Sequence, residues 1–260
     1  MNSSVSEKPI IALASWLTSP AGLYVRTWEE AQLAALTTNI FGFNAVQIGV
    51  PEIDGLAASR MPHRWIADTD IPRSCGLQAV VMHDFAELPF ATQSLDLVVL
   101  PHVLEFAHEP HQILREVDRV LIPEGQVIVT GFNPASLWGA RQAATRLTKR
   151  PFLPQSGELI GVPRIKDWLK LLDMEVYPGH FGCYAPPCNT ERWLQRFDFM
   201  ERAGARWWPF LGGVYIVQAI KRVKGMRLIG PAWNKKKASA RQRVPVANKH
   251  INHKNEYGQG

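Results

Sequence analysis

The chain has 260 residues, of which 46% are hydrophobic and 20% are charged. This length and composition suit one sizeable α/β domain with a buried core, and a second full domain is not expected. Three cysteines do not make a disulfide framework, which favours a reducing compartment and therefore the cytoplasm. The apolar runs are short, so the sequence predicts neither a signal peptide nor a membrane span.

The net charge of +6 is concentrated in the C-terminal part of the chain. Residues 221–260 contain eleven Lys or Arg residues and one acid, which leaves 18 basic and 22 acidic residues in positions 1–220. Apolar periodicity is lost after residue 232, so we expect a folded domain over 1–232 and a basic disordered tail over 233–260. Such a tail can attract nucleic acid or anionic lipid by charge, and a merely solvated terminus is the alternative.

Hydrophobic runs alternate with helical patterns before the tail, and this alternation predicts βαβ units with a parallel sheet. Residues 26–40 have apolar side chains close to helical spacing, which indicates a helix before the first strand. Three short strands are predicted after it, at 45–48, 64–67 and 77–82. A continuous apolar run at 95–100, with one acid near its start, is typical of a central strand buried on both faces.

The clearest predicted helix follows this central strand. Pro110 can open the helix at its first turn, apolar residues recur at helical spacing up to Leu121, and Pro123 with Gly125 closes it. The elements expected after it are a buried strand at 126–130, a helix at 164–172, a strand at 175–180, a helical and aromatic insertion at about 185–210, and a final strand at 213–220.

Residues 84–134 carry a more specific pattern. In order, they contain an acidic residue, a Leu-Pro-Phe turn, a Leu-Asp strand, a Leu-Arg-Glu helix that ends in Arg-Val-Leu, and a Pro-Glu-Gly turn. This stretch resembles the methyltransferase type 11 family of class I S-adenosylmethionine-dependent methyltransferases, and most closely a little-characterised bacterial branch of it. The resemblance implies a Rossmann-like, mostly parallel seven-stranded sheet with an antiparallel last strand, helices on both faces, and S-adenosyl-L-methionine as the cofactor.

In an open parallel sheet, ligands bind beyond the carboxyl ends of the strands. The cofactor residues that we expect lie at or just past predicted strand ends: Gly49, Asp68, Asp84, Phe85, Leu100, Pro101 and His102. In the family, the residue matching Asp84 accepts a hydrogen bond from the adenine amino group, and the residue matching Phe85 packs on the ring. The alternative for Asp84 is a turn aspartate that caps the next helix.

The first loop departs from the family pattern. The usual Gly-x-Gly-x-Gly is replaced by Gly-Val-Pro-Glu-Ile at 49–53, so only Gly49 holds its expected place. Val50 and Pro51 put bulk near the methionine end of the cofactor, and proline removes an N–H donor. The acid for the ribose hydroxyls is Asp68 or Asp70, and a surface acid explains either one equally well.

The acceptor side is less defined. Leu100-Pro101-His102 differs from the Asn/Asp-Pro-Pro-aromatic signature of many nucleic-acid and protein N-methyltransferases, which disfavours adenine or glutamine as acceptor. A neutral His102 is the candidate catalytic base for an oxygen acceptor, although a histidine at a strand end is more often structural. Asn133, Trp193 and Trp207 are candidate substrate-side residues. Aromatics that face the site would suit a hydrophobic acceptor, and a helix packed on the sheet is the alternative.

The leading hypothesis is therefore a methyltransferase that acts on an unidentified acceptor, more plausibly a small molecule. The competing hypothesis is a non-catalytic methyltransferase-like binding module, associated with RNA through the basic tail. No metal site is expected, because His180, Cys183 and Cys188 supply too few ligands. The sequence leaves the oligomeric state open.

Overall fold

The computed structural model describes residues 13–68, 78–81, 85, 87–148, 152–153, 158–188, 190–197 and 199–222. Contacts within the chain group Met1–Val223 into one compact unit and Lys224–Gly260 into a second. The predicted tail at 233–260 lies outside the described residues, as do Asp70 and Asp84. The boundary at residue 232 and the disorder of the tail therefore stay predictions.

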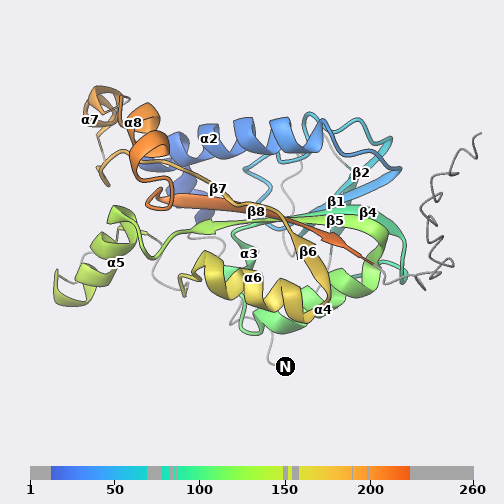
Figure 1. Ribbon diagram of the computed structural model, residues 1–260. Coiled ribbons are helices and arrows are strands. Elements are labelled where there is room, and N and C mark those ends of the chain that lie inside the picture. Colours follow the sequence, from blue (N-terminus) through green and yellow to red (C-terminus); the bar gives the residue numbers. More distant parts are fainter. Residues whose placement is uncertain are drawn as a thin grey trace, which may run out of the picture. The chain divides into compact units, whose positions relative to one another are not determined.

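A mostly parallel sheet forms the centre of the first unit (Figure 1). Among the described residues its strands are β1 (Asn44–Ile48), β2 (His63–Asp68), β3 (Gln78–Val81), β4 (Leu95–Pro101), β5 (Leu121–Phe132), β6 (Met174–Val176), β7 (His180–Gly182) and β8 (Val214–Lys221). The strand order is β3-β2-β1-β4-β5-β8-β6, and β7 also pairs with β8. Neighbouring strands from β3 to β5 are parallel, whereas β8 runs antiparallel to β5.

The two short strands β6 and β7 share one edge of the sheet. They pair with successive parts of β8, since Met174 lies opposite Lys221 and Gly182 lies opposite Val214. Together they fill one position beside β8, so the sheet has seven positions with β8 as the antiparallel member. This arrangement confirms the fold that the resemblance implies, although the single strand predicted at 175–180 is divided in two.

Helices cover both faces of the sheet (Figure 1). One face carries α2 (Pro20–Thr37), and the other carries α3 (Val103–Phe106), α4 (Pro110–Val120) and α6 (Val162–Leu171). The helices α5 (Leu137–Thr148), α7 (Glu191–Arg196) and α8 (Phe199–Trp207) lie at the end of the sheet where β5 finishes and β8 begins. None of the described helices is long and apolar enough to cross a membrane.

The central strand β4 is buried on both faces, as its apolar run predicts. Residues 97–100 have no exposed surface, and β4 lies between β1 and β5. The segment 121–125, which we expected to close α4, instead begins β5. Leu121 pairs with Leu95, and the register shifts before Leu97. Pro123 and Gly125 therefore lie in an irregular stretch of the strand, where a missing donor is tolerated.

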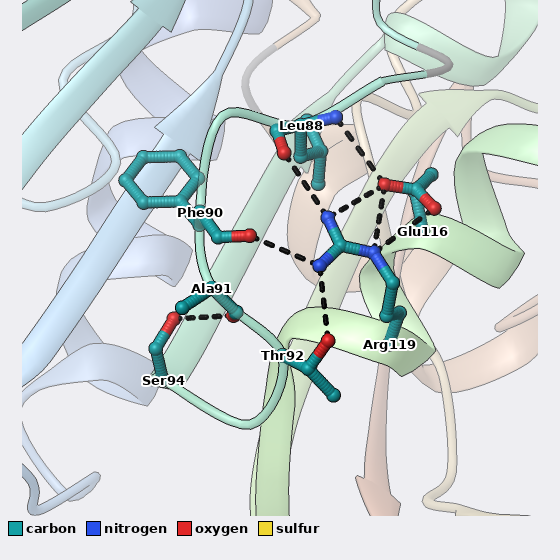
Figure 2. A network of polar contacts seen from close by, with 7 residues as sticks. All are labelled: Leu88, Phe90, Ala91, Thr92, Ser94, Glu116 and Arg119. Carbon is teal, nitrogen blue, oxygen red and sulfur yellow. Dashed lines mark hydrogen bonds and ion pairs between the residues drawn. The ribbon is translucent and has the colours of Figure 1, made fainter.

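The turn before β4 is held by α4 (Figure 2). The guanidinium of Arg119 donates to the carbonyl oxygens of Leu88 at 3.1 Å and Phe90 at 3.0 Å. The same group pairs with a carboxylate oxygen of Glu116 at 2.8 Å, and that carboxylate accepts the N–H of Leu88 at 3.3 Å. The Leu-Arg-Glu and Arg-Val-Leu segments of the resemblance therefore fix the Leu-Pro-Phe turn in place.

Candidate functional site

The carboxyl ends of β1, β2 and β4 meet at one edge of the sheet. Gly49 follows β1, and its N–H donates to the carbonyl oxygen of Ala67 in β2 at 2.8 Å. A Cβ atom on Gly49 would lie 2.9 Å from Cγ2 of Val103 and 3.5 Å from Cε1 of Phe85. The backbone of Gly49 has φ of 71°, which favours glycine. Gly49, the end of β2, Phe85 and the segment after β4 are thus neighbours.

Asp68 is the last residue of β2 and is 2% exposed. It directly follows Ala67, the residue that accepts the Gly49 N–H, so its backbone lies beside the Gly49 turn. Asp68 also interacts within the protein. At this edge a carboxylate at the end of β2 neighbours the ring of Phe85, which packs against the Gly49 turn and is 3% exposed. Carboxylates accept hydrogen bonds and aromatic rings stack on purines, which are the two contacts that an adenosyl group uses.

The loop after β1 is held by Gln47, which has no exposed surface. Its side-chain NH₂ donates to the carbonyl oxygens of Val50 at 3.0 Å and Ile53 at 2.7 Å, and its side-chain oxygen accepts the N–H of Gly55 at 2.9 Å. Val50 is 1% exposed, has φ of 44°, and belongs to the hydrophobic core. Hydrogen bonds from Gln47 therefore fix this loop, which is usually rich in glycine in the family that the sequence resembles. We did not identify Gln47 from the sequence, where the available signal was a polar residue inside an otherwise apolar strand.

His102 lies at the end of β4 between two carboxyl groups. Its Nδ1 is 2.9 Å from Oε2 of Glu105, and its Nε2 is 3.0 Å from Oε1 of Glu29 on α2. All three side chains are 0–1% exposed. The contact with Glu29 is within ion-pair distance but off the direction of a hydrogen bond, so its attraction is mainly between charges. Neither Glu29 nor Glu105 was a candidate from the sequence.

These carboxyl groups control the ionisation of His102. Burial by itself lowers the pKa of an imidazole, but Glu29 and Glu105 outweigh it and raise the pKa of His102 to about 10. Burial also raises the pKa of Glu105, against hydrogen bonds from His102 and from the N–H of Phe132, which is 2.6 Å from its Oε1. A ring that keeps its proton at neutral pH cannot accept another from a substrate. The geometry therefore favours a positioning role, in which His102 joins α2 to the ends of β4 and β5.

Leu100, Pro101 and Asn133 were also predicted for the site, and each is held within the protein. Leu100 and Pro101 are buried at the end of β4. The side-chain NH₂ of Asn133 donates to the carbonyl oxygens of Phe210 at 2.8 Å and Gly212 at 3.0 Å, and its Oδ1 accepts a backbone N–H at 3.1 Å. Asn133 thus fastens the segment before β8 to the end of β5.

The two candidate tryptophans lie on α7 and α8, at the end of the sheet where β5 finishes. Trp193 on α7 is 50% exposed and Trp207 on α8 is 68% exposed. These two side chains are therefore not buried against the sheet, although α8 itself packs on Tyr184 at Gly204. Their role toward a substrate stays a prediction.

Of the three residues weighed as metal ligands, His180 is exposed on β7, and Cys183 and Cys188 are free thiols. Among the residues that the structure describes, no group of three or more His, Cys, Asp or Glu side chains is arranged to hold a metal ion. Cys183 is a buried free thiol, and burial raises its pKa well above the usual range. A thiol of this kind is protonated and unreactive at neutral pH.

The chain resembles known proteins at three levels. Residues 66–129 match the family model of a methyltransferase domain. The chain is 30% identical over 236 residues to the uncharacterised protein YafS of Escherichia coli strain K12, covering 90% of this chain and 92% of YafS. A methyltransferase structure from Thermotoga maritima matches with a TM-score of 0.56 and 14% identity, covering 75% of this chain and 88% of that chain. The [4+2]-cyclase SpnF matches with a TM-score of 0.53 and 15% identity, covering 75% and 80%.

The sheet topology agrees with these likenesses. The chain belongs to the class I S-adenosylmethionine-dependent methyltransferases, in the family that includes YafS. S-adenosylmethionine is the cofactor of this class. The two structural matches, at 14% and 15% identity, show the fold alone.

Proposed function

We propose that this protein binds S-adenosylmethionine at the carboxyl edge of β1, β2 and β4 and transfers its methyl group to a small hydrophobic molecule. The observation that supports this proposal best is the juxtaposition of Gly49, the end of β2 at Asp68, and Phe85. The bound cofactor would supply a methyl group already activated by its sulfonium. The protein then has to orient two reactants and exclude water, which by itself supplies much of the rate.

Each residue of this edge has a proposed task. Asp68 accepts the ribose hydroxyls, Phe85 packs on the adenine ring, and the left-handed turn at Gly49 brings backbone close to the cofactor. Asp84, by resemblance, accepts the adenine amino group. Leu100 and Pro101 border the methyl end of the cofactor, and His102 holds the ends of β4 and β5 in position.

The exposed aromatic side chains of α7 and α8 support a hydrophobic acceptor. These helices lie at the end of the sheet where β5 finishes and Asn133 follows it. The segment after β4 lacks the Asn/Asp-Pro-Pro-aromatic signature, which argues against an amide or adenine nitrogen as acceptor. We place the protein in the cytoplasm, because few cysteines and a buried free thiol suit a reducing compartment.

Calorimetric titration of the full chain with S-adenosylhomocysteine and S-adenosylmethionine tests the proposal. The variant Asp68→Asn keeps the size of the side chain but removes the charged acceptor, so we expect its dissociation constant to rise at least about tenfold. The exposed Asp167→Asn is the matched control and should bind like the unchanged protein. The absence of heat from the unchanged protein at about 1 mM ligand would refute cofactor binding.

A second candidate is a non-catalytic module that keeps the fold. It is favoured by the loop at 49–55, which is held by hydrogen bonds from Gln47 and by the buried Val50 where the family has glycines. A salt-sensitive gel shift of RNA that persists in Asp68→Asn, together with no heat from either nucleoside ligand, would favour this module over the enzyme.

A further inference from the structure

Exposed aromatic side chains gather on the segment 193–211. Six of the eleven large hydrophobic side chains that are exposed among the described residues lie there: Trp193, Phe199, Trp207, Trp208, Phe210 and Leu211. We call these six residues the aromatic patch. Their exposed fractions run from 47% to 71%, and scattered surface hydrophobics would not concentrate in this way. A concentration of this kind marks an interaction surface.

The patch is an ordered surface built on two helices and the turn after them. The rings of Trp193 and Phe197 stack with centroids 6.0 Å apart, and those of Trp207 and Trp208 meet edge to face at 5.8 Å. On the inner side of α8, Gly204 is buried against the ring of Tyr184. One part of the helix is packed on the protein at Gly204, while the rings of Phe199 and Trp207 at its two ends stay 59% and 68% exposed.

Arginines accompany the aromatic patch. The described residues of α7 and α8 include four exposed ones, at positions i and i+4 of each helix: Arg192, Arg196, Arg202 and Arg206. The guanidinium of Arg196 lies 5.8 Å from the ring centre of Trp193. Glu191 is exposed, whereas Glu201 turns inward, where it accepts the hydroxyl of Tyr24 and the N–H of Tyr184. The outward charge on these two helices is therefore mainly positive.

The patch is joined to the end of β5, the strand beside β4. Asn133, directly after β5, binds the carbonyl oxygens of Phe210 and Gly212. Figure 1 shows α7 and α8 at the end of the sheet where β5 finishes. A flat surface that covers the aromatic patch would consequently lie at the same end of the molecule as the residues that follow β5.

We propose that the aromatic patch docks this protein on an anionic phospholipid bilayer. Tryptophan and phenylalanine rings favour the interfacial layer, and arginine pairs with lipid phosphate, so the two residue types on α7 and α8 match a charged membrane surface. The basic residues of 221–260 have the same sign and add long-range attraction. This inference goes beyond methyl transfer and does not depend on it, although a docked enzyme would meet acceptors dissolved in the membrane.

Flotation of the full chain with phosphatidylcholine vesicles, with and without phosphatidylglycerol, tests the docking. We expect binding to the anionic vesicles, and at least about tenfold weaker partitioning for Trp208→Ser with Phe210→Ser, because two rings no longer insert. Arg202→Gln with Arg206→Gln should reduce the preference for anionic vesicles. Phe41→Ser with Phe43→Ser is the matched control, since these side chains are 77% and 69% exposed before β1, and it should bind like the unchanged protein.

Two results would overturn the proposal. Equal vesicle binding by the Trp208/Phe210 variant and the unchanged protein would assign the attraction to the basic tail. Loss of affinity for a random single-stranded RNA in that variant, with no vesicle binding by any form, would make the aromatic patch a nucleic-acid surface. Circular dichroism of each variant checks its fold. Calorimetry with S-adenosylhomocysteine reports separately on the proposed function, so the failure of either idea can be recognised.

Discussion

His102 is enclosed by Glu29 and Glu105, and its proton is the feature of the site most open to direct measurement. We predict that its imidazole stays protonated at about pH 8.5, where an ordinary histidine is neutral. Nitrogen-15 NMR of the histidine ring measures this state, and His102→Gln identifies the resonance. Since its folded pKa of about 10 exceeds the ordinary 6.5, the proton's stabilisation is complete below pH 6.5 and is lost as pH rises toward 10. A midpoint near 6.5 would contradict the prediction.

The residues of the site differ in how far sequence could identify them. Gly49, Asp68 and His102 follow predicted strands, and strand ends of a parallel sheet meet at one edge, so their gathering could be expected. Glu29 could not be assigned, because its contact with His102 depends on how α2 lies across the sheet. Gln47 was overlooked for a different reason: its hydrogen bonds run to loop carbonyl oxygens, and a backbone partner leaves no trace in the sequence.

At the scale of elements, α4 and the turn before β4 depend on Arg119. Replacement of Arg119 by Met removes donors to the carbonyl oxygens of Leu88 and Phe90, and we expect the free energy of unfolding to fall by about 1–3 kcal/mol. Urea unfolding measures the change. Arg115→Met, on the exposed side of the same helix, should alter it little.

The same ion pair has a pH signature. The hydrogen bond from Arg119 lowers the pKa of Glu116 below its ordinary 4.5. The stability that this carboxylate contributes is therefore present above pH 4.5 and is lost as the pH falls through the lower folded pKa. The difference in unfolding midpoint between the unchanged protein and Arg119→Met should narrow as the pH falls from 6 to about 3, and the part due to the carbonyl oxygens of Leu88 and Phe90 should remain. A constant gap between the two would argue against the ion pair.

Elements with a strong pattern were predicted closely, and the weaker strands at 64–67 and 77–82 were also found, whereas the helix α5 was missed. β4 and α4 follow from a continuous apolar run and from helical spacing. α2 begins at Pro20, before the predicted residue 26, because Ser19 caps it by accepting the N–H of Gly22 at 3.1 Å. α5 was not predicted, since what holds it is tertiary: Trp138 is buried and donates to the carbonyl oxygen of Ala185 at 2.8 Å.

At the scale of the whole molecule, cofactor binding should appear as thermal stability. A ligand that binds the folded chain at a concentration one hundred times its dissociation constant adds about 2.7 kcal/mol. For a compact unit the size of Met1–Val223, each kcal/mol corresponds to roughly 2–4 °C in the melting temperature, so saturating S-adenosylhomocysteine should raise it by about 5–10 °C.

Asp68→Asn supplies the comparison for this melting experiment. At the same ligand concentration its tenfold weaker binding would lower the added stability by about 1.4 kcal/mol, so roughly half of the shift should remain. Both proteins are melted with and without ligand, because the substitution itself also changes the starting value. An equal shift in the two proteins would remove Asp68 from the site. If the ligand changes the melting temperature of neither protein, the loop held by Gln47 admits no nucleoside. The fold would then serve as a binding module.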